Sequence, residues 1–148
     1  MTKSVDVSDF AMELDKIMRK VEVGANKRTV GVITKGVRKS ATLWRKKARD
    51  LRWAEGDHTY KKHGKVYTTG KYVRSIKSHM VDKSPEHPAG ESGTPSMPGL
   101  GHLLEDGHSI PGGGFVRGHP HIRPAAKEAF DYTIDLMERE IGEVLDDV

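Results

Sequence analysis

The stretch VGVITKGVRKSATLWRKKARDL, residues 30–51, determines the expected fold more than any other part of the chain. Its apolar residues follow one another at intervals of three or four positions, and they are Val30, Ile33, Val37, Ala41, Trp44, Ala48 and Leu51. This spacing predicts an α-helix with one apolar face. Gly31 and Gly36 each cost about 1 kcal/mol relative to alanine in a helix. We therefore expect either a frayed start to this helix or another backbone close beside its glycines.

A separate, shorter helix is predicted before this stretch. Ser8 is a suitable N-cap, and Asp9 is favourable in the first turn of a helix. The apolar residues that then recur at helical spacing are Phe10, Leu14, Ile17, Met18 and Val21. Gly24 and Asn26 are expected to end this helix, so the sequence predicts two N-terminal helices.

The middle of the chain predicts a small, mostly antiparallel sheet. Residues 65–68 read as a short strand, and residues 75–81 read as another, although Val73 and Ile76 also fit a short helix. Residues 84–101, SPEHPAGESGTPSMPGLG, hold 4 of the 7 prolines and 4 of the 16 glycines. This composition predicts a long loop.

The C-terminal segment predicts a last helix that begins near Pro124, a residue well suited to a first helical turn. Its expected apolar stripe consists of Ala126, Phe130, Thr133, Met137, Ile141, Val144 and Leu145. The order helix, helix, small sheet, helix predicts an α+β fold, and 148 residues suit a single domain spanning 1–148.

The composition narrows the class of protein. The absence of cysteine excludes disulfides and thiolate metal sites. The first 16 residues, MTKSVDVSDFAMELDK, lack the apolar segment of a signal peptide, and no apolar run approaches the roughly 20 residues that cross a bilayer. We therefore expect a soluble protein made in a reducing cytoplasm, with no membrane partner. Only 35% of the residues are apolar, which fits a subunit that shares much of its surface with partners.

The charge is distributed unevenly. Residues 20–83 hold 18 basic and 5 acidic residues, whereas the rest of the chain holds 7 basic and 16 acidic residues. The basic side chains expected to face DNA or an acidic protein are Lys35, Arg38, Lys39, Arg45, Lys46, Lys47, Arg49 and Arg52. Trp44 and Trp53 flank the densest part, with Trp44 expected in the core. A sequence-nonspecific nucleic-acid-binding protein is therefore one alternative function.

Histidines gather late in the chain, where four of the eight lie between residues 102 and 121. Glu105, His108, His119 and His121 are the residues from which a metal site or an acid–base pair could be built. However, the sequence has no HExxH helix and no nucleophile motif. A metal-dependent hydrolase is therefore a second alternative only, and we expect no catalytic residue, no metal and no cofactor.

The segment GHLLEDGHSIPGGGFVRGHPHIRPA, residues 101–125, resembles a pattern of small siphophage neck proteins. Those proteins carry HLLE-x-GH, a glycine-rich turn, and PHI-x-PA leading into a C-terminal helix. The matching residues are His102, Leu103, Leu104, Glu105, Gly107, His108, Gly112, Gly113, Pro120, His121, Ile122, Pro124 and Ala125. Upstream, Thr69-Gly70 with Val73 to Ile76 resembles the family's TG-x-(L)-x-x-S-I element. The family comprises head–tail joining, or tail-completion, proteins similar to minor tail protein Z.

The physical features of this segment predict a rigid corner. Its glycines permit positive φ and a tight reversal, and Pro120 and Pro124 favour an extended path into the last helix. Nothing in the segment requires chemistry.

The resemblance implies a non-enzymatic structural subunit of the bacteriophage head–tail connector, located in the virion and synthesised in the bacterial cytoplasm. It implies a ring of identical subunits, with six-fold symmetry favoured and twelve-fold possible. The implied neighbours are a portal-side adaptor or head-closure protein, a tail terminator or tail tube, and genomic DNA in the central channel. Acidic residues of the last helix that we expect at subunit contacts are Glu138, Glu140 and Glu143.

Overall fold

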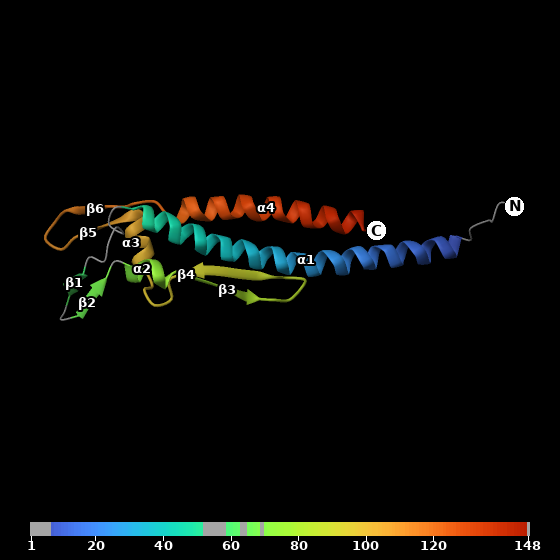
Figure 1. Cartoon of the computed structure of the whole chain (residues 1–148), viewed down its shortest axis with the longest axis horizontal. Coiled ribbons are helices and arrows are strands. Elements are labelled where there is room, and N and C mark those ends of the chain that lie inside the picture. The colour runs from blue at the N-terminus through green and yellow to red at the C-terminus, as the bar shows by residue number, and fades with distance from the viewer. Residues whose placement is uncertain (1–6, 52–58, 63–64, 69, 148) are drawn as a thin grey trace.

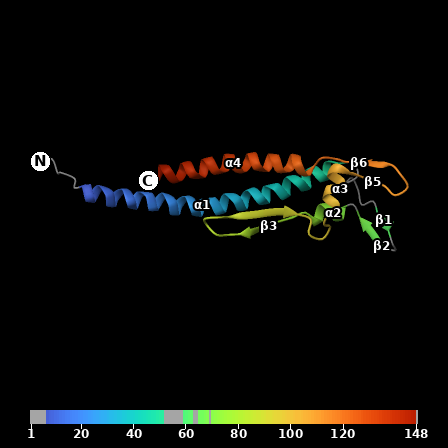
Figure 2. The same cartoon turned by 180° about the vertical axis from the view of Figure 1, so that it is seen from behind.

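Two long antiparallel helices form the frame of the molecule (Figure 1). The computed structural model describes residues 7–51, 59–62, 65–68 and 70–147, with side chains for 11–51 and 70–147. Helix α1 spans Val7–Asp50, and helix α4 spans Ile122–Asp146. The N-terminal end of α1 projects well beyond the C-terminal end of α4, as the reverse view in Figure 2 also shows. No helix in the described ranges combines the length and the apolarity needed to cross a membrane.

The predicted break between two N-terminal helices is wrong, because α1 continues through Gly24 and Asn26. The reason is tertiary packing. A Cβ at position 24 would lie 3.0 Å from Cγ1 of Val144, so the glycine lets α4 approach closely. The contact between the two helices offsets the roughly 1 kcal/mol that glycine costs in a helix.

Gly36 has the same role nearer the middle of α1. It is buried, and a side chain there would clash with Thr133 of α4. The expected close approach of another backbone is therefore confirmed at Gly36. At Gly31 it is not, because a Cβ there would meet no atom within 4 Å.

Helix α1 is covered on two sides, which widens its buried face beyond the predicted stripe. Ala41, Trp44 and Ala48 are buried as expected. Val32 and Leu43 are buried as well, although they lie off the stripe. Helix α4 packs along one side of α1, and the hairpin of strands β3 and β4 packs along another.

The predicted apolar stripe of α4 is displaced from the face that is buried. The buried residues are Ala125, Ala129, Leu136 and Val144. Phe130 is 65% exposed, and Ala126 and Leu145 are exposed too. Near the corner, the contact with α1 buries the small Ala125 and Ala129, and farther along α4 it buries Leu136 and the predicted stripe residue Val144.

The strands form three separate two-stranded antiparallel hairpins in the described residues, instead of one small sheet. The pairs are β1 Thr59–Lys62 with β2 Lys65–Thr68, β3 Lys77–Asp82 with β4 Ala89–Gly93, and β5 Gly107–Ser109 with β6 Phe115–Arg117. The expected strands at 65–68 and near 75–81 are confirmed. The expected loop at 84–101 is wrong in part, because β4 lies inside it and pairs with β3.

Two short helices complete the fold, α2 Gly70–Ser75 and α3 Leu100–Asp106. They lie at the end of the molecule where α1 ends and α4 begins (Figure 1). Tyr72, Val73 and Ile76 enter the core there, together with Trp44 and Ala125. This core carries the polar residues of the candidate site. Mixed helices and antiparallel hairpins agree with the predicted α+β class.

Candidate functional site: a buried polar corner

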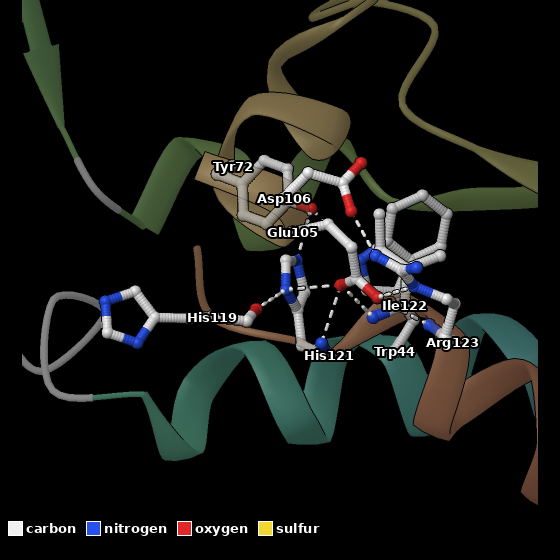
Figure 3. A network of polar contacts seen from close by, with 8 residues as sticks. All are labelled: Trp44, Tyr72, Glu105, Asp106, His119, His121, Ile122 and Arg123. Carbon is white, nitrogen blue, oxygen red and sulfur yellow. Dashed lines mark hydrogen bonds and ion pairs between the residues drawn. The ribbon is translucent and has the colours of Figure 1, made fainter. Parts of the chain in front are cut away.

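The carboxylate of Glu105 binds the first turn of α4. Glu105 is only 4% exposed. Its Oε2 accepts hydrogen bonds from the backbone N–H groups of His121 and Ile122, both at 2.7 Å, and its Oε1 accepts one from the N–H of Arg123 at 3.0 Å (Figure 3). The next residue, Pro124, has no N–H to satisfy. All the backbone donors that a helix start leaves without partners are therefore accounted for, although Glu105 lies on another helix.

The charge of Glu105 is stabilised by the same contacts. Burial alone would raise the pKa of Glu105, but the three backbone donors and Nε of Arg123 at 3.2 Å outweigh it and lower the pKa to about 2. Arg123 also contacts Asp106, and its own pKa is raised by Glu105 and Asp106. The helix dipole of α4 favours a negative charge at this position. Glu105 is thus ionised at neutral pH, and it caps α4.

His121 is the fully buried centre of a second chain of hydrogen bonds. Nε1 of Trp44 donates to Oη of Tyr72 at 3.1 Å, and this hydroxyl lies 2.7 Å from Nε2 of His121. On the other side of the ring, Nδ1 lies 2.6 Å from the carbonyl oxygen of His119 and 3.1 Å from Oε2 of Glu105 (Figure 3).

Two directions in this chain follow from the groups themselves. Indole N–H groups only donate, so the oxygen of Tyr72 accepts from Trp44. Nδ1 of His121 faces only acceptors, the carbonyl of His119 and the carboxylate of Glu105, so it carries a hydrogen and donates. Burial raises the pKa of Tyr72 to about 12, with Glu105 adding to the rise, so the phenol keeps its proton. The network ties α1, α2, α3 and α4 together.

The glycines of the corner act as the sequence predicts. Gly107 has φ +84°, and Gly112, Gly113 and Gly114 have φ between +92° and +117°. L-residues with side chains rarely adopt these values. A Cβ at Gly107 would also collide with the backbone of β6, so this residue allows the strands of the hairpin to meet α3. The N–H of His119 then donates to the carbonyl of Leu104 at 2.7 Å and closes the turn.

The structure gathers part of the predicted motif and leaves the rest at the surface. Residues that meet in the corner or its core are Leu104, Glu105, Gly107, His121, Ile122 and Ala125. His102, Leu103, Gly112, Gly113, Pro120 and Pro124 are exposed. His108 is half-buried, and its Nδ1 has no hydrogen-bond partner within the described residues. Sequence analysis missed Tyr72 as part of the site. A hydroxyl-bearing aromatic next to the apolar Val73 and Ile76 is the signal that points to it.

The described residues do not form the metal site or the exposed acid–base pair that the sequence suggested. The described residues contain no group of three or more His, Asp or Glu side chains that could hold a metal ion. The suggested acid–base pair needs an accessible carboxylate on Glu105, but both of its oxygens already accept hydrogen bonds from α4. This geometry favours a structural role for the corner.

Several basic residues of α1 are bound within the subunit. Lys47 lies 2.9 Å from Glu128, and Lys35 lies 3.5 Å from Glu140. Arg45 donates to the carbonyl of Ile76 at 2.8 and 3.1 Å. Lys39 lies over the ring of Tyr132, 5.1 Å from its centroid. Arg38, Lys46 and Arg49 are exposed, and so is Lys35 despite its ion pair. Trp44 is in the core as expected. Arg52 and Trp53 lie outside the described residues.

Most acidic residues of α4 form ion pairs with basic residues of the same chain. Arg28, which the sequence analysis did not single out, donates to Glu140 at 2.9 Å and to Glu143 at 2.6 Å. These contacts hold the pKa of Glu140 below its ordinary value. Glu138 is exposed. Glu143 is exposed too, although it is paired with Arg28, whereas Glu140 is half-buried.

Comparison with known proteins gives no relative: no family model, no curated protein and no solved structure matches this chain. Any functional proposal therefore rests on the residues themselves and on their geometry.

Proposed function

We propose that this protein is a structural, non-enzymatic subunit of the head–tail connector of a tailed bacteriophage. The observation that carries the proposal is the role of Glu105 in the motif. In the segment that resembles neck proteins, the buried carboxylate of Glu105 caps α4, and both of its oxygens are occupied by hydrogen bonds from the start of that helix. A motif that fixes a helix on a frame suits an assembly protein whose surfaces must meet partners in one orientation.

The distribution of exposed apolar residues also supports assembly. Large apolar side chains are exposed at both ends of the molecule, including Met18 near the start of α1 and Phe115 in the β5–β6 hairpin. Exposed apolar patches of this kind mark protein–protein contacts. In the proposed connector, the neighbours are further copies in a ring of six or twelve subunits, a portal-side adaptor or head-closure protein, and a tail terminator or tail tube.

Sequence-nonspecific binding of nucleic acid is the second candidate function. It is supported by the exposed cations Arg38, Lys46 and Arg49 on α1. Ion pairs to Glu128 and Glu140 reduce the free positive charge of the same helix. Such a surface suits weak, salt-sensitive contact with DNA in a channel. Tight, salt-resistant binding of one DNA sequence would favour a dedicated DNA-binding protein instead.

The decisive experiment is complementation of a phage that lacks the gene. We expect the deletion to give filled heads and separate tails in electron micrographs, and the wild-type gene to restore virions. Glu138→Lys, at an exposed position, should leave the fold intact and reduce joining, whereas Lys127→Glu on the same helix is the matched control. Normal virions without the gene would refute the connector assignment.

A further inference from the structure

The first turns of α1 form an amphipathic arm whose apolar side chains are exposed, and a hydrogen bond of 3.1 Å from Nζ of Lys20 to the carbonyl oxygen of Asp147 ties the end of the arm to α4. The arm, residues 10–21, projects beyond the end of α4 (Figures 1 and 2). Its side chains from 11 to 20 are all exposed, and the apolar Leu14, Ile17 and Met18 are 46%, 43% and 63% exposed. A stripe of this kind at helical spacing is normally covered in a folded protein.

The same subunit contains an open apolar groove. The groove has a volume of about 470 Å³ and lies between α1, α4 and strand β4. Its floor is α1 around Gly36, and α4 lines it from Ala126 to Met137. Phe130 and Ile134 stand at this groove with 65% and 43% of their surface exposed.

The arm and the groove match in length and in chemistry. The described side chains of the arm span residues 11–21, and the α4 wall of the groove spans residues 126–137. Each is about 16 Å long at 1.5 Å per residue. Insertion of the apolar face of a helix into such a groove is a common mode of recognition.

The arm cannot occupy the groove of its own subunit. Arm and groove floor belong to one continuous helix, α1, which keeps them apart. The occupant must therefore come from another molecule. Every copy carries both parts, so the contact can repeat from one copy to the next head-to-tail, and such contacts generate closed rings when the rotation closes. A reciprocal exchange of arms between two copies would stop at a dimer instead.

We propose that the arm of one subunit docks in the α1–α4–β4 groove of the next copy. This inference deepens the proposed connector function, since it names the contact between ring subunits. One helix in one groove is small compared with stable interfaces of about 1,200–2,000 Å². Free subunits should therefore associate weakly and form the ring at high local concentration.

Cross-linking of the purified full-length chain tests the contact directly, because the sequence contains no cysteine. Ile17→Cys in the arm and Ile134→Cys in the groove, mixed as single variants, should give a dimer with a short bismaleimide. The double variant should give a ladder of dimers, trimers and larger species. Both positions are exposed, so neither substitution should unfold the subunit.

Met12→Cys mixed with Ile134→Cys is the matched control, because Met12 lies on the opposite face of the arm and is 58% exposed. We expect its yield to be at least fivefold lower than that of Ile17→Cys. Equal yields, no 17–134 product at millimolar protein, or efficient linking of Ile17→Cys to itself alone would overturn the proposal. The assay contains no phage, so its failure leaves the complementation result standing, and the reverse also holds.

Discussion

The two ends of this molecule differ in whether their side chains find partners within the subunit. At the corner, where α4 begins, buried polar groups find partners inside the subunit, and Glu105 alone serves three backbone donors. At the arm, apolar side chains that a fold normally covers stay exposed. A buried polar group left unpaired costs about 1–3 kcal/mol, and Nδ1 of His108 is the exception among the described residues. Exposed apolar surface is tolerated. The corner therefore holds the elements of the subunit together, and the arm is the part that we propose for assembly.

The largest effect is expected from loss of the cap at the corner. Glu105→Ala leaves the N–H groups of His121, Ile122 and Arg123 buried without an acceptor, and it leaves Arg123 without its main partner. We expect the free energy of unfolding to fall by about 3–5 kcal/mol. Urea titration followed by circular dichroism measures it. Asp106→Ala, which removes only an exposed ion pair to Arg123, should cost less than about 1 kcal/mol.

Acidification should weaken the corner in a defined range of pH. The pKa of Glu105 is about 2 in the folded chain, below the ordinary value of 4.5. Its contribution is therefore fully present above pH 4.5 and is lost as the pH falls from there toward 2. Linkage gives a loss of about 3 kcal/mol across this range. Urea titrations at pH 7, 4.5, 3 and 2.5 measure the loss.

Glu105→Gln provides the control for this pH dependence, since it has no carboxylate to protonate. Its unfolding free energy should fall less steeply between pH 4.5 and 2.5 than that of the wild type. Parallel curves for the two proteins would show that Glu105 is not the group responsible.

The sequence predicted the parts of the fold that depend on local pattern, and it missed those that depend on tertiary contact. The spacing from Val30 to Leu51 identified α1 and its core residues Ala41, Trp44 and Ala48. The glycine at position 24 was misread as a helix end, because nothing local shows that Val144 lies against it. In α4 the stripe was displaced, since a close helix contact buries Ala125 and Ala129 and leaves Phe130 exposed.

For the candidate site, the sequence likewise predicted the local features and missed the contacts between distant segments. The glycine turns and the packing role of the motif follow from residue types, and the positive φ angles confirm the turns. The cap itself could not be foreseen, because Glu105 and the start of α4 are joined only by the path of the hairpin between them. Tyr72 is still farther away in sequence, and its bond to His121 exists only in the folded core.

A smaller effect should distinguish Gly36 from Gly31, two of the three glycines of α1. Gly36→Ala forces a methyl group against Thr133, and we expect a loss of about 1–3 kcal/mol from overpacking. Gly31→Ala meets no atom within 4 Å, and it should stabilise the chain by about 0.5–1 kcal/mol through helix propensity. Thermal unfolding of both variants tests the pair. The same sign of change in both would contradict the packing of α1 on α4 at Gly36.

The smallest effect is expected in the arm, and it is the sharpest test of the comparison between the two ends. Leu14→Ser removes an apolar side chain that is already 46% exposed, so the free energy of unfolding should change by less than about 0.5 kcal/mol. Leu43→Ser, in the core of the same helix, should cost about 3 kcal/mol or more. Both are measured by urea titration at low micromolar protein, because association would otherwise add to the apparent stability of the wild type. A cost above about 1 kcal/mol for Leu14→Ser under dilution would mean that the arm helps to hold the subunit together. The arm would then be part of the fold, and a partner would no longer be needed to explain its apolar stripe.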